Sequence, residues 1–319
     1  MRAGLFSAIV ASCLSLGGAQ AQEWPSRQPI KIIVPFTAGS GTDIVARTVF
    51  EQVGRQINQS IVTENRGGAG TTIGSNAVAK ASPDGYTVLV NSTSHVVVAS
   101  TYAKLPYHVI DDFAPVSALA DLPFVLAART RYRTLDDLVQ AAKAQPGSLN
   151  FGSAGAGSSG QLFIERFRLA AGFEARHVPF RGTPEAMTEI MSDRLDLFPA
   201  PVSSAIELAR DGKISALAVS SRTRMQSMPD LPTTIELGYP NSDYNFWVGA
   251  FLPAKTPADI VKRLHAEIVR ALETPHVRKS LSALGGDPMP LAPEAFVRFL
   301  RKELEVNAEI VRLSGFKPQ

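Results

Sequence analysis

Three stretches rich in glycine, serine and threonine have the residue types that bind an anion through backbone and hydroxyl groups. They are residues 35–43 (PFTAGSGTD), 67–71 (GGAGT) and 154–160 (AGAGSSG). Glycine lets the backbone approach a ligand, and a helix start offers unpaired N–H groups and the positive end of the helix dipole. The first stretch therefore predicts an anion-binding loop. The alternative is an ordinary strand-to-helix connection capped by Thr42 or Asp43.

Other kinds of chemistry have less support in the sequence. Residues 155–160 match the G-x-G-x-x-G pattern of dinucleotide sites, but the next predicted strand ends at Arg181, where such a site needs an acid. Neither a G-x-S-x-G nucleophile motif nor a P-loop motif occurs. The five histidines lack metal-ligand spacing, and only His95 follows a predicted strand in a loop that could reach a ligand. We therefore expect no catalytic residue, metal or cofactor, and keep His95 as a candidate ligand contact.

The elements that must position these loops are strands that alternate with helices. An apolar strand at residues 30–34 precedes a helix with apolar residues every four positions, at Val45, Val49, Val53 and Ile57. A polar cluster, residues 91–95, follows the third strand. Because parallel strands joined by helices bind ligands beyond their carboxyl ends, we expect the loops to gather at one cleft. Strands are predicted at residues 30–34, 61–65, 86–90, 124–128, 149–153, 176–180, 195–198, 214–219 and 244–252.

Several helix starts carry capping residues. Thr134 precedes an acid three residues later, and Thr183 stands before Pro184, which suits an N-cap followed by a first helical position. The last predicted helix covers residues 293–314. The pattern restarts twice, so we predict an α/β protein of two lobes joined by two crossing segments that act as a hinge. One lobe would comprise residues 23–123 with 241–319, and the other residues 124–240.

The amino terminus predicts export. A short apolar run, residues 5–16, leads to Ala19-Gln20-Ala21, a pattern typical of signal peptide cleavage, and the run is shorter than the ~20 residues that span a bilayer. We expect a periplasmic protein cleaved after Ala21, with lipidation at Cys13 as the alternative. Cleavage would remove Cys13, the only cysteine, so the mature chain would lack disulfides. The net charge of +3 with scattered basic residues gives little support to nucleic-acid or membrane binding. We expect a monomer.

Short motifs along nearly the whole mature chain carry a family resemblance. They occur at residues 24–36 with Gly39 and Asp43, and at residues 64–70, 83–86, 104–107, 149–153, 177–182, 211–213, 217–219 and 231–234. In this order and spacing they resemble the Bug family, the periplasmic solute receptors of tripartite tricarboxylate transporters. The resemblance implies a type II periplasmic-binding-protein fold, two α/β lobes around a ligand cleft, with no catalysis. It also implies partnership with the membrane subunits of such a transporter.

The resemblance further implies how a ligand binds. In this family backbone amides and hydroxyls at helix starts hold a carboxylate without a charged partner, and the first loop reaches the far end of the ligand partly through ordered waters. Arg66 and Arg181 would then hold loops, and a direct arginine–carboxylate clamp is the alternative. Thr183 would begin the corresponding helix opposite the other loops. The ligand contacts implied for this chain are Phe36, Thr37, Ala38, Gly39, Gly70, Thr71, Asn91, Thr93, Gly157, Ser158 and Ser159.

One position departs from the family pattern. Many relatives carry an aspartate where this chain has Ala200. An acid there could pair with a ligand amine, so its absence favours a plain mono- or dicarboxylate or an aromatic acid.

Two other functions stay open. One is a ligand sensor for a membrane signalling partner, and the other is an exported α/β hydrolase, which would lose turnover on Ser158→Ala.

Overall fold

The computed structural model describes residues 24–319 except residues 181, 226, 245, 317 and 319. The expected signal peptide, the lipidation alternative at Cys13 and the loop-holding role of Arg181 concern residues outside this description. No helix of the described chain is long and apolar enough to cross a membrane.

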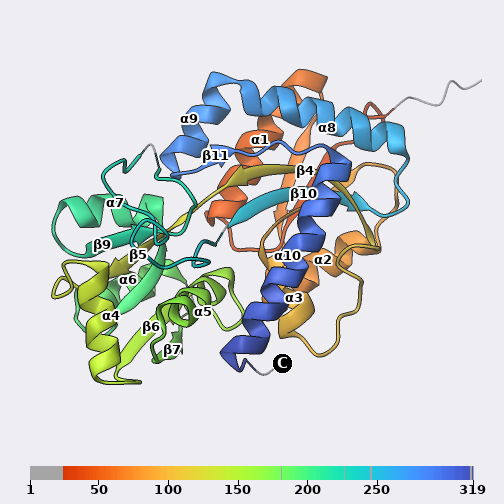
Figure 1. Ribbon diagram of the computed structural model, residues 1–319. Coiled ribbons are helices and arrows are strands. Elements are labelled where there is room, and N and C mark those ends of the chain that lie inside the picture. The colour runs from red at the N-terminus through yellow and green to blue at the C-terminus, as the bar shows by residue number, and fades with distance from the viewer. Residues whose placement is uncertain (1–23, 181, 226, 245, 317, 319) are drawn as a thin grey trace, which may run out of the picture.

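The strands form two sheets, confirming the α/β class and the two lobes (Figure 1). The first sheet has the order β11-β4-β10-β3-β1-β2, and the second has the order β7-β6-β8-β5-β9. In the first, β10 runs antiparallel to β3 and β4, while β1 pairs in parallel with β2 and β3. The first sheet consists of β1 (Ile30–Val34), β2 (Ile61–Asn65), β3 (Thr87–Ser92), β4 (Phe113–Asp121), β10 (Trp247–Pro253) and β11 (Asp287–Pro288). The second consists of β5 (Phe124–Ala128), β6 (Leu149–Ser153), β7 (Ala175–Pro179), β8 (Leu197–Pro201) and β9 (Ser215–Val219).

The chain passes between the sheets twice, from β4 to β5 and from β9 to β10. The predicted lobe boundaries, residues 23–123 with 241–319 and residues 124–240, remain a proposal that the sheet membership of the strands supports. The helices are α1 (Gly41–Ile57), α2 (Thr72–Ala79), α3 (Ser94–Thr101), α4 (Leu135–Ala144), α5 (Ser159–Ala171), α6 (Thr183–Met191), α7 (Val202–Arg210), α8 (Ala258–Glu273), α9 (Pro275–Ala283) and α10 (Pro293–Ser314). A 3-10 turn, η1 (Ala69–Thr71), precedes α2.

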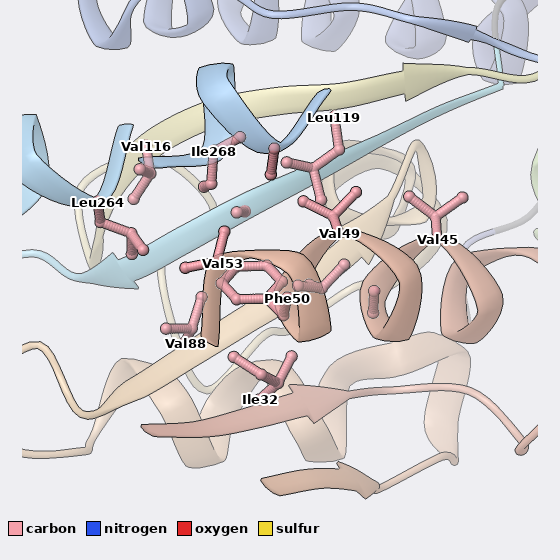
Figure 2. Packing of buried hydrophobic residues seen from close by; sticks show 14 of the residues in the cluster. Ile32, Val45, Val49, Phe50, Val53, Val88, Val116, Leu119, Leu264 and Ile268 are labelled. Carbon is pink, nitrogen blue, oxygen red and sulfur yellow. The ribbon is translucent and has the colours of Figure 1, made fainter. Parts of the chain in front are cut away.

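Helices cover both faces of the first sheet because its strands are apolar on both sides. Ile32 packs with α1 and α8 on one face, whereas its neighbour Ile33 packs with α3 and α10 on the other, as the alternation of side chains along a strand requires. Figure 2 shows the first of these layers, in which the apolar stripe of α1 packs together with strands of the sheet and with Leu264 and Ile268 of α8. The stripe consists of the fully buried residues Val45, Val49, Phe50 and Val53.

The last helix contacts both lobes. Phe296 and Leu300, near its start, pack in the core of the first lobe, while Ile310 and Val311 pack with the core residues of the second. Figure 1 shows α10 running from the first sheet down to α5. Because α10 spans both cores, it must accommodate any hinge motion of the lobes.

Several local predictions need correction. The polar cluster at residues 91–95 is not a loop, because β3 continues to Ser92 and α3 begins at Ser94, where Val96, Val97 and Val98 supply a buried face. Ser40 caps α1, not Thr42 or Asp43. Gly182 is the N-cap of α6, so Thr183 is its first helical residue.

Candidate ligand-binding site

The first ligand loop, residues 35–40, is held at both ends by one buried carboxylate. Asp43 is 2% exposed and accepts hydrogen bonds from Gly39 N (2.9 Å), Asn65 Nδ2 (2.8 Å) and Arg47 Nε (3.0 Å). Asn65 also donates to the Phe36 carbonyl at 3.1 Å. Burial by itself raises the pKa of Asp43, but the hydrogen bonds from Arg47, Gly39 and Asn65 lower it overall, so the group is ionised.

This support leaves the tip of the first loop exposed. Thr37, Ala38 and Gly39 face solvent, and Phe36 is half-buried. Gly39 has a left-handed backbone (φ +80°), which a glycine adopts without strain. Asp43, Arg47 and Asn65 were not among the predicted site residues. The sequence does contain a signal for Asp43, because this acid stands three residues after the serine of a small-residue loop.

The third ligand loop, residues 154–158, repeats the geometry of the first in the second lobe. Gly157 is left-handed (φ +73°), and the Ser158 side chain caps α5 by accepting from Gln161 N at 3.4 Å. Gln161 Oε1 in turn accepts from Gly157 N at 2.8 Å. The first turn of α5 contains no acid. The start of this helix therefore keeps its positive dipole end uncompensated by a side-chain charge.

The second ligand loop, residues 66–71, carries backbone strain. Ala69, Gly70 and Thr71 all have positive φ, of 44°, 61° and 83°. Such a conformation costs roughly 1–3 kcal/mol at each non-glycine residue, and strain of this kind clusters at ligand sites. Asn91 supports the loop from below by donating to Thr71 Oγ1 (3.4 Å) and Ser75 Oγ (3.1 Å).

Six of the predicted contacts are buried: Thr71 and Ser159 each keep 5% of their surface exposed, whereas the other four keep none. Asn91, Thr93, His95 and Ala200 are all fully buried. Asn91 has both ends of its amide engaged, since Oδ1 also accepts from Ser92 N at 2.7 Å. Thr93 exchanges hydrogen bonds with the Trp247 backbone at 3.0 Å. These two residues hold the polypeptide behind the site.

His95 and Ala200 belong to the cores. The His95 ring stacks on Phe251 with centroids 4.3 Å apart, and its Nε2 bonds to the Val109 carbonyl at 2.8 Å. Burial lowers the pKa of His95 to about 4, so the ring is neutral. Ala200 lies in β8 opposite Val125, within the apolar core of the second lobe. Because all four residues face inward, we omit them from the ligand contacts proposed below.

Two further residues bear on the predictions. The Arg66 guanidinium forms an ion pair with Glu64, so that arginine already has a protein partner. Thr183 is half-buried at the start of α6, and no hydrogen bond among the described residues joins it to the other loops. The loop-holding role of Arg66 stays a prediction.

A serine and a histidine lie close together beneath the third loop. Ser153 Oγ is 2.6 Å from His177 Nε2 and 2.7 Å from the Gly155 carbonyl. The carbonyl can only accept, so the single hydroxyl hydrogen of Ser153 goes there, and His177 must donate to Oγ. Burial lowers the pKa of His177 to about 4, which keeps it neutral. A nucleophilic serine would donate its hydrogen to the histidine. Here the histidine donates to the serine, so the pair instead holds the Gly155 carbonyl in place.

The three loops lie close together. A methyl group built on Gly67 would be 3.8 Å from the Phe36 carbonyl carbon, so the first and second loops are neighbours. A methyl group on Gly157 would be 3.4 Å from Thr101 of α3, and one on Gly70 would be 2.8 Å from the adjacent residue, Tyr102. The end of α3 therefore contacts both the second loop, in its own lobe, and the third loop, in the other lobe.

Two open depressions lie elsewhere, at the carboxyl end of α1. Their volumes are about 500 and 390 Å³, and both are lined by Asn58 and Gln59. No predicted site residue lines either depression. Among the described residues, no group of three or more His, Asp or Glu side chains is placed to hold a metal ion.

Two α/β lobes joined by two crossings, with the third loop of one lobe against the end of α3 in the other, define a two-lobed solute-binding protein. The chain belongs to the tripartite tricarboxylate transporter receptor family (TctC), whose sequence profile matches residues 45–316. This confirms the resemblance to the Bug receptors. The protein BugT of Bordetella pertussis is 33% identical over 301 residues, covering 93% of this chain and 92% of BugT.

Solved structures of the family share the fold. MatC from Rhodopseudomonas palustris with bound malate is 30% identical with a TM-score of 0.79, covering 90% of this chain and 99% of MatC. Rpa4515 from R. palustris with adipate is 27% identical with a TM-score of 0.85, covering 93% of this chain and 100% of that one. The chain is therefore a receptor of a family in which carboxylates are bound.

Proposed function

We propose that the protein is an exported receptor that binds a small carboxylate between its lobes and delivers it to a tripartite tricarboxylate-type membrane transporter. The observation that carries the binding step is the start of α5. There a left-handed Gly157, a capping Ser158 and a neutral Gln161 leave helix N–H groups with no acid beside them. The malate and adipate held by MatC and Rpa4515 support the same ligand class for this chain.

The available donors are sufficient for a useful affinity without a cation. Ser158 Oγ accepts from Gln161 N and keeps its own hydrogen to donate to a ligand. A hydrogen bond to a charged group contributes about 1.5–3 kcal/mol, so several give the roughly 8 kcal/mol of micromolar binding. The proposed contacts are Phe36, Thr37, Ala38, Gly39, Gly70, Thr71, Gly157, Ser158, Ser159 and Thr183.

The ligand class follows from charge. None of the proposed contacts is acidic, so none of them would pair with a ligand amine; Ala200 lies in the core and does not bear on this choice. A mono- or dicarboxylate or an aromatic acid therefore fits better than an amino acid.

The family consists of periplasmic receptors. We propose that the mature form of this protein is also periplasmic and is cleaved after Ala21. We further propose that it is a monomer and that it needs no metal or cofactor.

Thermal unfolding of ligand-free protein against a panel of mono-, di- and tricarboxylates and aromatic acids tests the proposal. An acid at about 100 times its dissociation constant should stabilise the fold by about 2.7 kcal/mol and raise the melting temperature. Its methyl ester should bind far more weakly. A panel without any shift, or an ester that binds as tightly as its acid, would contradict carboxylate binding.

Delivery to a transporter is tested separately. Purified receptor should capture the transporter's membrane subunits from detergent-solubilised membranes, and more strongly with ligand bound. Capture of a membrane sensor in their place would favour the signalling alternative. Turnover of an ester or amide that is lost in Ser158→Ala would favour the hydrolase alternative.

A further inference from the structure

We propose that Tyr102 determines ligand specificity by donating its phenolic hydroxyl to a second oxygen-bearing group of the ligand, so that the receptor prefers dicarboxylates to monocarboxylates. This rests on the proposed carboxylate-binding function and narrows it. None of the sequence motifs indicated Tyr102.

The backbone places Tyr102 where α3 ends. Its N–H bonds to the Val98 carbonyl at 3.1 Å, and its own backbone is extended (φ −116°, ψ 131°). The chain leaves the helix at this residue, so the side chain is set by the last turn of α3. The preceding residue, Thr101, is 1% exposed and donates from Oγ1 to the Val97 carbonyl at 3.2 Å. The position of the tyrosine is thus fixed by a buried, hydrogen-bonded neighbour.

The Tyr102 ring lies against the strained second loop. A methyl group on Gly70 would be 2.8 Å from both Cε2 and the hydroxyl oxygen of Tyr102. A side chain at position 70 would therefore collide with the ring, in addition to requiring a left-handed backbone (φ +61°). The hydroxyl end of the phenol consequently sits at the exposed turn of the loop.

The third loop lies on the other side of the same helix end. Thr101 is the residue that faces Gly157, with its Cβ and Oγ1 both 3.4 Å from a methyl group built there. Gly157 therefore lies against Thr101, and Gly70 lies against the outer end of the Tyr102 ring on the next residue. A ligand whose carboxylate is held at the start of α5 and which extends toward Gly70 must pass beside Tyr102.

The phenol is available to such a ligand. Tyr102 is half-buried, and no hydrogen bond among the described residues uses its hydroxyl. By contrast, the Tyr132 hydroxyl lies 3.2 Å from Asp196 and the Tyr244 hydroxyl 2.9 Å from Asn307. A tyrosine that is partly buried usually finds a partner for its O–H. The ring face suits the carbon chain of an acid, and the hydroxyl suits an oxygen at its far end.

Titration calorimetry on full-length mature protein with two matched pairs tests this, namely adipate against hexanoate and succinate against butyrate. In the wild type the dicarboxylate of at least one pair should bind more tightly than its monocarboxylate. Tyr102→Phe keeps the ring against Gly70 and should weaken that dicarboxylate about tenfold, while the monocarboxylate changes less than twofold. Tyr86→Phe is the control, because its hydroxyl accepts from Arg27 N at the other end of β3.

The outcomes separate the two proposals. If the wild type binds these acids and Tyr102→Phe binds every one equally well, Tyr102 does not select the ligand and carboxylate binding stands. An equal loss for both members of a pair would also overturn selection, since it would report general damage to the site. If neither these acids nor the wider panel binds the wild type, the proposed function itself fails. Thermal unfolding of each variant establishes that it is folded.

Discussion

The first and third ligand loops have the same backbone design in the two lobes. Each has a left-handed glycine, Gly39 or Gly157, followed by a capping serine with extended backbone, at φ −66° and −74°. In each, the residue three positions after the serine accepts a hydrogen bond from the glycine N–H, at 2.9 and 2.8 Å. That residue is Asp43 in one lobe and Gln161 in the other.

This one difference gives the two loops different electrostatics. A helix start carries the equivalent of roughly half a positive charge, which the full negative charge of Asp43 offsets. Asp43 also accepts hydrogen bonds from Asn65 and from the partly exposed Arg47, so a carboxylate of the protein already occupies this helix start. Gln161 satisfies the same glycine N–H without adding charge. A ligand carboxylate is therefore expected at α5, with the uncharged donors of the first loop left for the rest of the molecule.

Adding a charge to the third loop should have the largest effect. Gln161→Glu can still accept from Gly157 but places a carboxylate beside the bound anion. Two like charges about 5 Å apart repel by roughly 3 kcal/mol at an effective dielectric constant of about 20, so affinity should fall about 100-fold. Calorimetry at pH 7.5 measures this, with Gln52→Glu on α1 as the control. A change of less than threefold would contradict the electrostatic difference between the loops.

Removing the charge from the first loop should affect stability more than binding. Asp43→Asn loses charge-assisted hydrogen bonds and leaves Arg47 without its ion pair, which should lower the free energy of unfolding by about 1–2 kcal/mol. Carboxylate affinity should change less than threefold. Urea unfolding and calorimetry give the two values. A tenfold change in affinity at unchanged stability would show that Asp43 acts on the ligand directly.

Acid should loosen the third loop before the first. Burial lowers the pKa of His177 from 6.5 to about 4, so the folded state favours the neutral ring. The contribution of this histidine to the free energy of unfolding is complete above pH 6.5 and is lost as the pH falls toward 4. The pKa of Asp43 is lowered from 3.8, so the contribution of its carboxylate to the free energy of unfolding is lost only below pH 3.8. Hydrogen exchange corrected for intrinsic rates should therefore rise between pH 7 and pH 5 in residues 153–161 more than in residues 36–47.

The control for this experiment is His177→Gln, which should remove the extra acid response of residues 153–161. A variant is needed because His95, buried in the first lobe with a pKa near 4, destabilises the whole fold over the same pH range. Equal responses of the two segments in the wild type would contradict the different supports of the loops.

The smallest effects should come from the capping serines. Ser40→Ala and Ser158→Ala each remove an N-cap and should each cost about 1 kcal/mol of stability. Only Ser158→Ala should also weaken carboxylate binding, by about tenfold, because it removes one hydrogen bond to the charged ligand. Each variant is the control for the other. Equal losses of affinity would mean that both helix starts hold the anion.

Much of the fold could be predicted from local pattern. The predicted bounds are correct for three strands and the last helix, namely Ile30–Val34, Ile61–Asn65, Leu149–Ser153 and Pro293–Ser314. Thr134 forms the predicted capping box with Asp137. Gly39, Gly70 and Gly157 have the left-handed backbone that such turns require. These features depend on residues close in sequence. The short helix α3 was missed because three β-branched valines disfavour a helix until packing buries them.

The sequence by itself determined most of the strands and helices, the glycine loops and the family to which the chain belongs, because periodicity, capping and motif order are local. It did not predict β4 or α3. The tertiary structure decided which polar side chains are buried and which are exposed. Thr93 is held by Trp247, 154 positions along the chain, and this contact turns it inward. Tyr102 stays half-buried, with its ring beside Gly70 and next to the contact between Thr101 and Gly157 of the other lobe. Exposure at these positions depends on contacts between distant segments, which no local pattern contains.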